Sequence, residues 1–125
     1  MSARILIVDD DRDNRELLEI ILRREGFQTL TAAGGEEALV ATAQGPWPDL
    51  ILLDVMMPGM TGYEVAAKLK GDLATKDIPI IMVTALDDQR TRTLARTAGA
   101  ADLLTKPVAS AALCACVRKL LPAPG

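Results

Sequence analysis

The sequence predicts an α/β fold in which helices cover both faces of a parallel sheet. Three observations predict it: five short apolar runs alternate with five segments of helical periodicity, short connections join them, and residues 50–53 (LILL) have the apolarity of a strand buried on both faces. Because such repeats require right-handed crossovers, we expect a flavodoxin-like doubly wound (βα)5 three-layer sandwich with five parallel strands in order 2-1-3-4-5.

The first two repeats each combine a strand-like run with signals for a following helix. Residues 5–8 (ILIV) are the first strand. Asp13 and Glu16 have the spacing of a capping box for the first helix, which Gly26 ends. That helix is expected to turn four apolar side chains to one face: Leu17, Leu18, Ile21 and Leu22. The second repeat consists of a strand at residues 28–32, a turn at residues 34–35 and a helix at residues 36–43.

The last three repeats continue the alternation. Ile78-Pro79 opens the fourth strand, because proline is acceptable as the first residue of a strand. Carboxylates at Asp87 and Asp88 complement the dipole of the fourth helix, and Gly99 ends that helix. The remaining elements are strands at residues 50–53, 80–83 and 103–105 and helices at residues 61–69 and 110–121.

Length and charge limit the classes of function. The chain has 125 residues, half of them apolar, so we expect one domain at residues 1–121, followed by a short tail or the start of a linker at residues 122–125. A net charge of -3 argues against nucleic-acid binding, since such proteins carry an excess of Lys and Arg. The amino terminus holds no stretch suited to a signal peptide or a membrane span, so we expect a cytoplasmic protein without membrane contact.

Histidine and cysteine usage exclude further chemistry. The chain contains no histidine, which rules out His-ligated metal sites, Ser-His or Cys-His catalysis, and any role as a histidine phosphodonor. Cys114 and Cys116 are two residues apart in a helical pattern, so their side chains diverge and match no redox or zinc spacing. We interpret them as small packing residues in a reducing compartment.

Reactive side chains follow four of the predicted strands. Asp9, Asp10 and Asp11 follow the first strand, Asp54 the third, Thr84 the fourth and Lys106 the fifth. Because the carboxyl ends of parallel strands meet at one edge of the sheet, these groups are expected to converge there.

The converging groups suit phosphoryl transfer. Asp9, Asp10 and Asp54 would repel one another unless a hard divalent cation joined them, and Mg²⁺ is the ion that a few carboxylates plus phosphate oxygens favour. The charges of the three carboxylates are balanced by one divalent cation and the Lys106 ammonium, so the assembly is neutral and can accept an anion. Asp54 is therefore the candidate phosphoacceptor, forming an acyl phosphate, and Thr84 and Lys106 would contact the phosphoryl oxygens.

Each residue alone has a simpler explanation. Asp11 is best explained as a helix cap, Thr84 as an ordinary β-branched strand end, and Lys106 as a solvated charge. Even Asp54, taken alone, fits a structural role better than a nucleophilic one. Their joint occurrence on four strand ends is what favours a site.

With these residues in place, the chain closely resembles the receiver domain of two-component response regulators. The matching stretches are residues 5–11 (ILIVDDD), 53–62 (LDVMMPGMTG), 83–85 (VTA) and 104–107 (LTKP). The resemblance implies that Asp54 accepts a phosphoryl group from a phosphohistidine on a sensor histidine kinase or histidine phosphotransfer protein. It also implies that Mg²⁺ is held directly by Asp10 and Asp54, largely through water by Asp9, and by the main-chain carbonyl of Met56.

The resemblance further implies a switch rather than an enzyme acting on other substrates. Such a domain assists its own phosphorylation and dephosphorylation, changes conformation, and thereby controls an output domain or partner protein. A homodimer through the face formed by the fourth helix, fifth strand and fifth helix is compatible with this class, and the Lys106-Pro107 bond is usually cis.

The chain departs from the family at several positions. Leu103 stands where family members usually have Tyr or Phe, so the usual coupling of Thr84 to a rotating aromatic ring would be weaker, and Ala101 and Val108 leave that face plain. Met56 and Leu86, two residues beyond Asp54 and Thr84, offer no hydrogen bond to a hydrolytic water, which predicts slow self-dephosphorylation.

Two other readings differ in class. One is an interaction module that keeps the fold without phosphorylation, which Leu103 would allow. The other is an aspartyl-phosphate phosphatase of the haloacid dehalogenase type, but Met56 stands where that class needs a second Asp as general acid.

Overall fold

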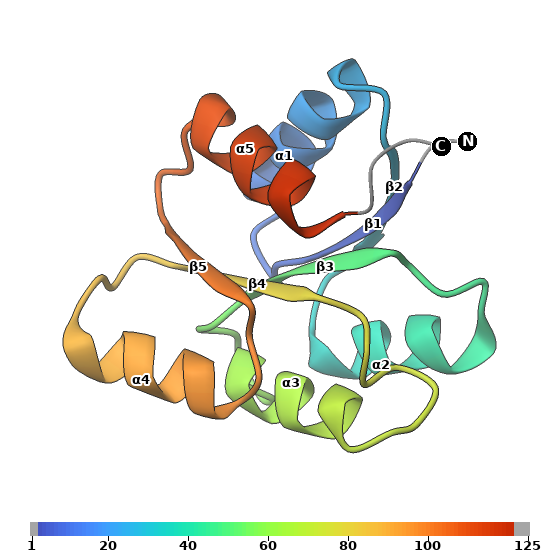
Figure 1. The fold of residues 1–125 in the computed structure, drawn as a ribbon, viewed down its shortest axis with the longest axis vertical. Helices are drawn as coiled ribbons and strands as arrows, with labels where there is room; N and C mark the ends of the chain where they lie inside the picture. The colour runs from blue at the N-terminus through green and yellow to red at the C-terminus, as the bar shows by residue number, and fades with distance from the viewer. Residues whose placement is uncertain (1–2, 122–125) are drawn as a thin grey trace.

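The computed structural model describes residues 3–121, which form a five-stranded sheet between two layers of helices (Figure 1). The strands are parallel and lie in the order β2-β1-β3-β4-β5, as the sequence predicts. Along the chain the elements are β1 Arg4–Val8, α1 Arg12–Arg24, β2 Gln28–Ala32, α2 Gly35–Gln44, β3 Leu50–Asp54, α3 Gly62–Lys70, β4 Ile80–Thr84, α4 Gln89–Thr97, β5 Asp102–Thr105 and α5 Ser110–Leu120. The proposed tail at residues 122–125 lies outside the described residues.

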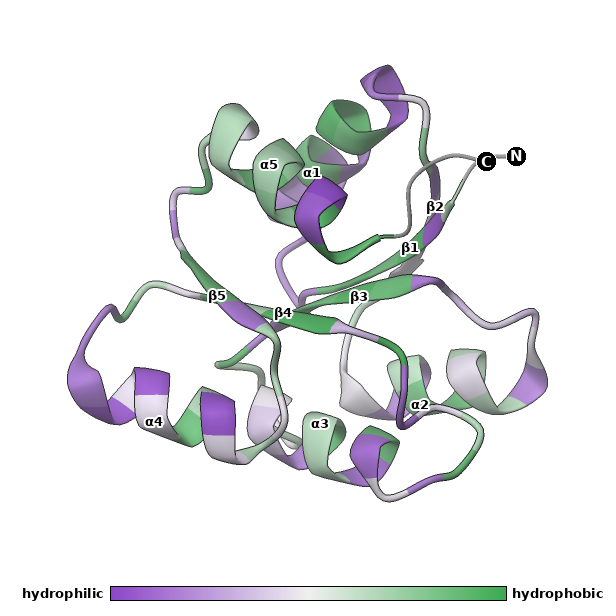
Figure 2. Ribbon diagram, in the orientation of Figure 1, coloured by the Kyte–Doolittle hydropathy of each residue, from purple (hydrophilic) through white to green (hydrophobic). Residues whose placement is uncertain are grey.

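The helices divide into two groups, one on each face of the sheet. Figure 1 shows α1 and α5 together on one side and α2, α3 and α4 on the other. The two faces carry separate cores, one containing Ile7, Leu52 and Ile81 and the other Leu6, Leu53 and Met82. Alternate residues of each strand therefore enter opposite layers, and β3 and β4 are buried along their whole length. Figure 2 shows the same pattern as hydrophobic central strands.

The start of α1 differs from the sequence-based expectation. The predicted capping box of Asp13 and Glu16 is wrong, whereas the role of Asp11 as a helix cap is confirmed. Asp11 is the N-cap, and its side chain accepts the N–H groups of Asp13 and Asn14. A run of neighbouring acids offers several possible caps, and the extended backbone at Asp11 decides between them. Leu17 is also misassigned, since it is 52% exposed, because four apolar residues span a wider arc than the buried stripe of the helix.

The remaining boundaries shift by a few residues. The fourth strand begins at Ile80, after Ile78-Pro79, and the predicted third strand extends by one residue to include Asp54. Asp88 is the N-cap of α4, in agreement with the expected role of this acid, and Gly99 follows the helix with a φ of 97°, which suits glycine. A capping box does exist at the start of α3, between Thr61 and Glu64.

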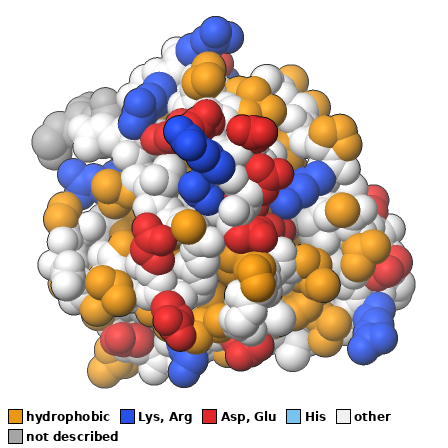
Figure 3. Space-filling view, turned by 180° about the vertical axis from the view of Figure 1, so that it is seen from behind, with side chains coloured by type: hydrophobic (Ala, Val, Ile, Leu, Met, Phe, Trp, Pro, Cys, Tyr) orange, Lys and Arg blue, Asp and Glu red, His pale blue; other side chains and the backbone are white. Residues whose placement is uncertain are grey.

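The two cysteines are buried, and charges of both signs lie on the surface (Figure 3). Cys114 and Cys116 are buried free thiols in α5. Lys and Arg side chains are separated by acidic and apolar ones on the face seen in Figure 3. Within residues 3–121, every helix is too short or too polar to cross a membrane.

Candidate functional site

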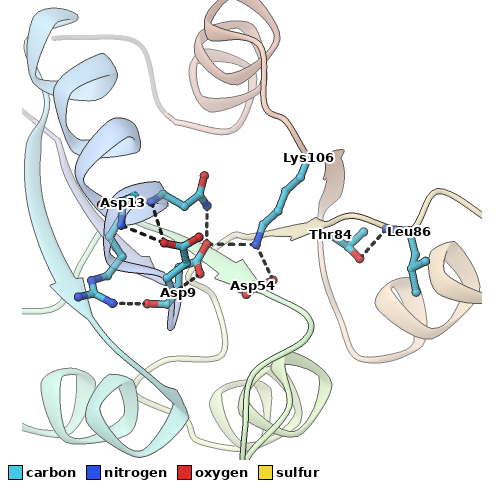
Figure 4. A network of polar contacts seen from close by, with 9 residues as sticks. Asp9, Asp13, Asp54, Thr84, Leu86 and Lys106 are labelled. Atoms are coloured by element: carbon cyan, nitrogen blue, oxygen red, sulfur yellow. Dashed lines mark hydrogen bonds and ion pairs between the residues drawn. The ribbon is translucent and has the colours of Figure 1, made fainter.

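Three carboxylates gather at the carboxyl edge of the sheet. Asp9, Asp10 and Asp54 each offer an oxygen, and these oxygens all lie within 4.8 Å of one another. Asp9 is 1% exposed and Asp54 3% exposed, whereas Asp10 is exposed. The structure thus brings together the acids that the sequence singles out after the first strand and at the end of the third. Figure 4 shows Asp9 and Asp54 near each other.

The register of the central strands explains this convergence. β1 pairs with β3 so that Val8 lies beside Leu53. Asp54 is the last residue of β3 and Asp9 is the first residue after β1, so the two acids lie next to each other at the carboxyl edge of the sheet. The backbone after Asp54 is packed tightly against the start of α3. A Cβ on Gly62 would lie 2.3 Å from the Asp54 carbonyl oxygen, so the close approach requires glycine.

Lys106 reaches the acids from the end of β5. Its Nζ lies 3.2 Å from Asp54 Oδ1 and 3.3 Å from Asp9 Oδ2 (Figure 4). The Lys106-Pro107 bond is cis, which confirms the expectation drawn from the resemblance. A single ammonium therefore contacts both buried carboxylates.

Asp9 is held by groups of the loop and helix that follow it. One carboxylate oxygen accepts the Asp11 N–H at 2.9 Å, the other accepts the Asn14 side-chain amide, and Arg15 donates to the Asp9 carbonyl at 2.7 Å. Asn14 and Arg15 are not among the residues singled out from the sequence. Their position in the first turn of the helix after β1, close to the acidic edge, is the feature that could have indicated them.

Burial and repulsion set the protonation of Asp54. Burial, and then the charge of Asp9, raise the pKa of Asp54 to about 6, although the Lys106 ammonium and the Met56 main-chain N–H act in the opposite direction. For Lys106, burial lowers the pKa, but the Asp54 and Asp9 carboxylates outweigh it and the pKa is raised. The cluster combines three carboxyl groups with one ammonium, and its possible metal ligands are all hard oxygens. That donor set fits a small divalent cation such as Mg²⁺.

Thr84 lies at the end of β4, but its hydroxyl is engaged elsewhere. The residue is 1% exposed, and its Oγ1 accepts the Leu86 N–H at 3.1 Å (Figure 4). The hydrogen bond that the Thr84 side chain accepts therefore connects it to the β4–α4 loop and not to the acids. Thr84 is adjacent in topology to the site, as predicted, and its hydroxyl would have to turn to act there.

Apolar side chains flank the site on two loops. Met56 is 64% exposed and Leu86 51% exposed. The main-chain N–H of Met56 acts to lower the pKa of Asp54. The expected role of the Met56 carbonyl as a metal ligand stays a prediction. Leu103 is half-buried and packs against the core on the side of α3 and α4.

Comparison with known proteins gives a consistent result. The family model of the response regulator receiver domain matches residues 5–118. The response regulator PleD of Caulobacter vibrioides is 49% identical over 120 residues, which cover 96% of this chain and 26% of PleD. The chain therefore spans about a quarter of that relative.

Solved structures of the same class superimpose closely. The chemotaxis protein CheY4 of Vibrio cholerae has a TM-score of 0.91 at 30% identity, covering 97% of this chain and 100% of that one. The receiver domain of the sensor histidine kinase PA1611 of Pseudomonas aeruginosa has a TM-score of 0.87 at 28% identity, covering 96% and 98%, and holds a magnesium ion coordinated in its active site cleft. The matched family, the fold and the acidic cluster agree: this chain belongs to the response regulator receiver domains, the signalling domains of two-component systems.

Proposed function

We propose that Asp54 is the phosphoacceptor of this receiver domain. The observation that carries the proposal is the contact of one ammonium, Lys106, with both Asp54 and Asp9 inside a cluster of three carboxylates. A buried carboxylate beside a cation and two further acids has the surroundings that an incoming phosphoryl group and its counter-ion require.

The reaction follows from these positions. A carboxylate oxygen of Asp54 attacks the phosphorus of a phosphohistidine, a P–O bond forms, and the P–N bond breaks with its electron pair passing to the imidazole. Lys106 keeps its contact with Asp54 and pairs with a phosphoryl oxygen as negative charge moves onto that group. The Thr84 hydroxyl turns from Leu86 and donates to a second phosphoryl oxygen.

A metal ion completes the charge balance. Asp9, Asp10, Asp54 and the Met56 carbonyl would hold Mg²⁺, with Asp9 acting largely through water. The chemistry that magnesium supplies when bound is neutralisation of the acids and of the phosphoryl oxygens. The receiver domain of PA1611 from Pseudomonas aeruginosa, which holds a magnesium ion in its active site cleft, supports this assignment.

The phosphodonor lies outside the 125 residues of this chain. Because these residues include no histidine, the phosphohistidine would belong to a sensor histidine kinase or a histidine phosphotransfer protein. Phosphorylation then shifts the conformation that an output domain or partner reads, and the domain assists both the gain and the loss of its phosphoryl group. Two free buried thiols fit the reducing cytoplasm. A homodimer through α4, β5 and α5 is a proposal that sedimentation before and after phosphorylation would test.

Small-molecule phosphorylation tests the function directly. Incubation with Mg²⁺ and acetyl phosphate, followed by intact mass measurement, should give one phosphoryl adduct in the wild type and none in Asp54→Asn. Asp49→Asn, at an exposed acid just before β3, is the matched control and should keep the adduct. Absence of an adduct in the wild type would favour the interaction module, and turnover of a phosphate ester would favour the phosphatase.

A further inference from the structure

The loop between β4 and α4, residues 85–88, is tied to its surroundings by polar contacts at both ends. At the strand end, the Leu86 N–H donates to Thr84 Oγ1 at 3.1 Å. At the helix end, the Asp88 carboxylate accepts the Thr91 N–H at 2.7 Å and caps α4. Because Leu86 belongs to this loop, the loop conformation determines whether Thr84 Oγ1 accepts the Leu86 N–H.

A third contact joins the same loop to the body of α4. Arg92 Nε donates to Asp87 Oδ1 at 2.7 Å, and a terminal nitrogen of the same guanidinium contacts the same oxygen. The two side chains are 51% and 44% exposed. Arg92 also borders, together with Leu103, a hollow of about 180 Å³ between α4 and β5. The Arg92 side chain thus contacts the loop beside the site and also lines the hollow between α4 and β5.

We propose that the Asp87–Arg92 pair is a clasp that holds the β4–α4 loop in the conformation of the unphosphorylated domain. This inference rests on the proposed function of Asp54. When the Thr84 hydroxyl turns toward a phosphoryl group on Asp54, it releases the Leu86 N–H, and the loop residue next to Asp87 must move. Arg92 is accordingly a positioning residue that acts on Thr84 through the loop.

The Asp87–Arg92 contact is strong enough to favour one loop conformation but too weak to prevent the other. An exposed ion pair shifts a two-state equilibrium by about two- to fivefold, which phosphorylation can readily overcome. Leu103, on the neighbouring strand β5, is aliphatic and has no polar group with which to contact the Thr84 hydroxyl. The clasp supplies a charged connection between the loop and α4 that Leu103 cannot.

Hydrogen exchange at one amide tests the clasp in the unphosphorylated protein. Exchange of the Leu86 N–H, followed by NMR, should be about two- to fivefold faster in Arg92→Ala than in the wild type. Arg96→Ala is the matched control: Arg96 lies one helical turn further along α4 and borders the same hollow, so its loss should leave this exchange unchanged. The charge-swapped double variant Asp87→Arg with Arg92→Asp should restore the wild-type rate.

The rate of phosphorylation by acetyl phosphate gives the second readout. Arg92→Ala should be modified about two- to fivefold faster, and the charge-swapped variant at the wild-type rate. The clasp would be overturned if Arg92→Ala and Arg96→Ala changed the Leu86 exchange rate and the phosphorylation rate equally. It would also be overturned if the charge-swapped variant did not return these rates to the wild-type values. Adduct formation with unchanged Leu86 exchange in Arg92→Ala would overturn the clasp alone, whereas no adduct in the wild type would overturn the proposed function and the switching role with it.

Discussion

The Lys106 ammonium lies 3.2 Å from Asp54 Oδ1. Within residues 3–121, it is the cation that pairs with this buried carboxylate. Burial and the charge of Asp9 push the pKa of Asp54 upward, and Lys106 pulls it back. Asp54 must be ionised to act as a nucleophile. Its ionisation therefore depends on Lys106 and on any cation that joins the acids.

Removing Lys106 should make Asp54 harder to ionise. In Lys106→Gln without metal, we expect the pKa of Asp54 to rise above the value of about 6 that it has in the wild type, because the opposing positive charge is lost. NMR titration of the Asp54 carboxyl carbon measures this pKa. Lys119→Gln removes a comparable ion pair, with Asp102, on α5 and should leave it unchanged. An equal or lower pKa in Lys106→Gln would contradict the role of the ammonium.

Metal-free stability should fall as the pH rises through the titration of Asp54. The folded-state pKa of about 6 lies above the ordinary value of 3.8, so the folded state binds the proton more tightly. The contribution of Asp54 to stability is therefore greatest below the ordinary value and declines up to about pH 6. Asp54→Asn should remove this slope and stabilise the metal-free protein at pH 7 by about 1–3 kcal/mol.

Denaturant unfolding in the presence of a chelator, at pH 4.5 and pH 7, checks that prediction. Asp77→Asn, at an exposed acid in the segment before β4, should keep the wild-type slope. A difference in stability between the wild type and Asp54→Asn that is the same at pH 4.5 and pH 7 would contradict the raised pKa of Asp54.

The apolar side chains beside the site should prolong the phosphorylated state. Met56 and Leu86 are largely exposed at its rim and give a hydrolytic water no hydrogen bond. Because one hydrogen bond contributes roughly 1 kcal/mol, Met56→Asn should shorten the lifetime of the phosphoryl group by up to about tenfold. Decay of the adduct, followed by intact mass, measures it. Leu73→Asn, at a distant residue that is 83% exposed, should leave it unchanged, and an unchanged lifetime in Met56→Asn would count against the idea.

The backbone behind Asp54 should tolerate no side chain at Gly62. The added Cβ would lie 2.3 Å from the Asp54 carbonyl oxygen and 2.9 Å from Val55 Cα, so Gly62→Ala must displace the loop. We expect a loss of stability of about 2 kcal/mol or more, with slower phosphorylation. Gly34→Ala is the control, because its Cβ would meet nothing within 4 Å and its φ of -174° is extended backbone. Equal unfolding midpoints for the two variants would contradict the close approach.

The sequence was sufficient to predict the sheet order and the convergence of Asp9, Asp10, Asp54 and Lys106. Strand ends are readable because buried parallel strands are continuously apolar, and topology then places their last residues at one edge. The contacts that hold Asp9 were not predictable in the same way. Asn14 and Arg15 lie in the first turn of α1 and carry no strand-end signal of their own, so their contacts with Asp9 become visible only in the structure.

Helix starts were the least predictable feature. Asp11 and Asp13 are both acceptable caps by residue type, and the difference lies in which backbone is extended. The Asp87–Arg92 pair was equally hidden, because it spans the cap of α4 at a spacing of neither a helical turn nor a strand. Such contacts depend on loop geometry, which composition and periodicity do not encode.

Locating the phosphoryl group tests the central claim most directly. After incubation with Mg²⁺ and acetyl phosphate, hydride reduction converts an aspartyl phosphate to the corresponding alcohol, and peptide mapping identifies the altered residue. We predict the modification at Asp54 alone, with none in Asp54→Asn. Modification of Asp9 or Asp10 in the wild type, or an adduct that persists in Asp54→Asn, would contradict the assignment of Asp54 as the phosphoacceptor.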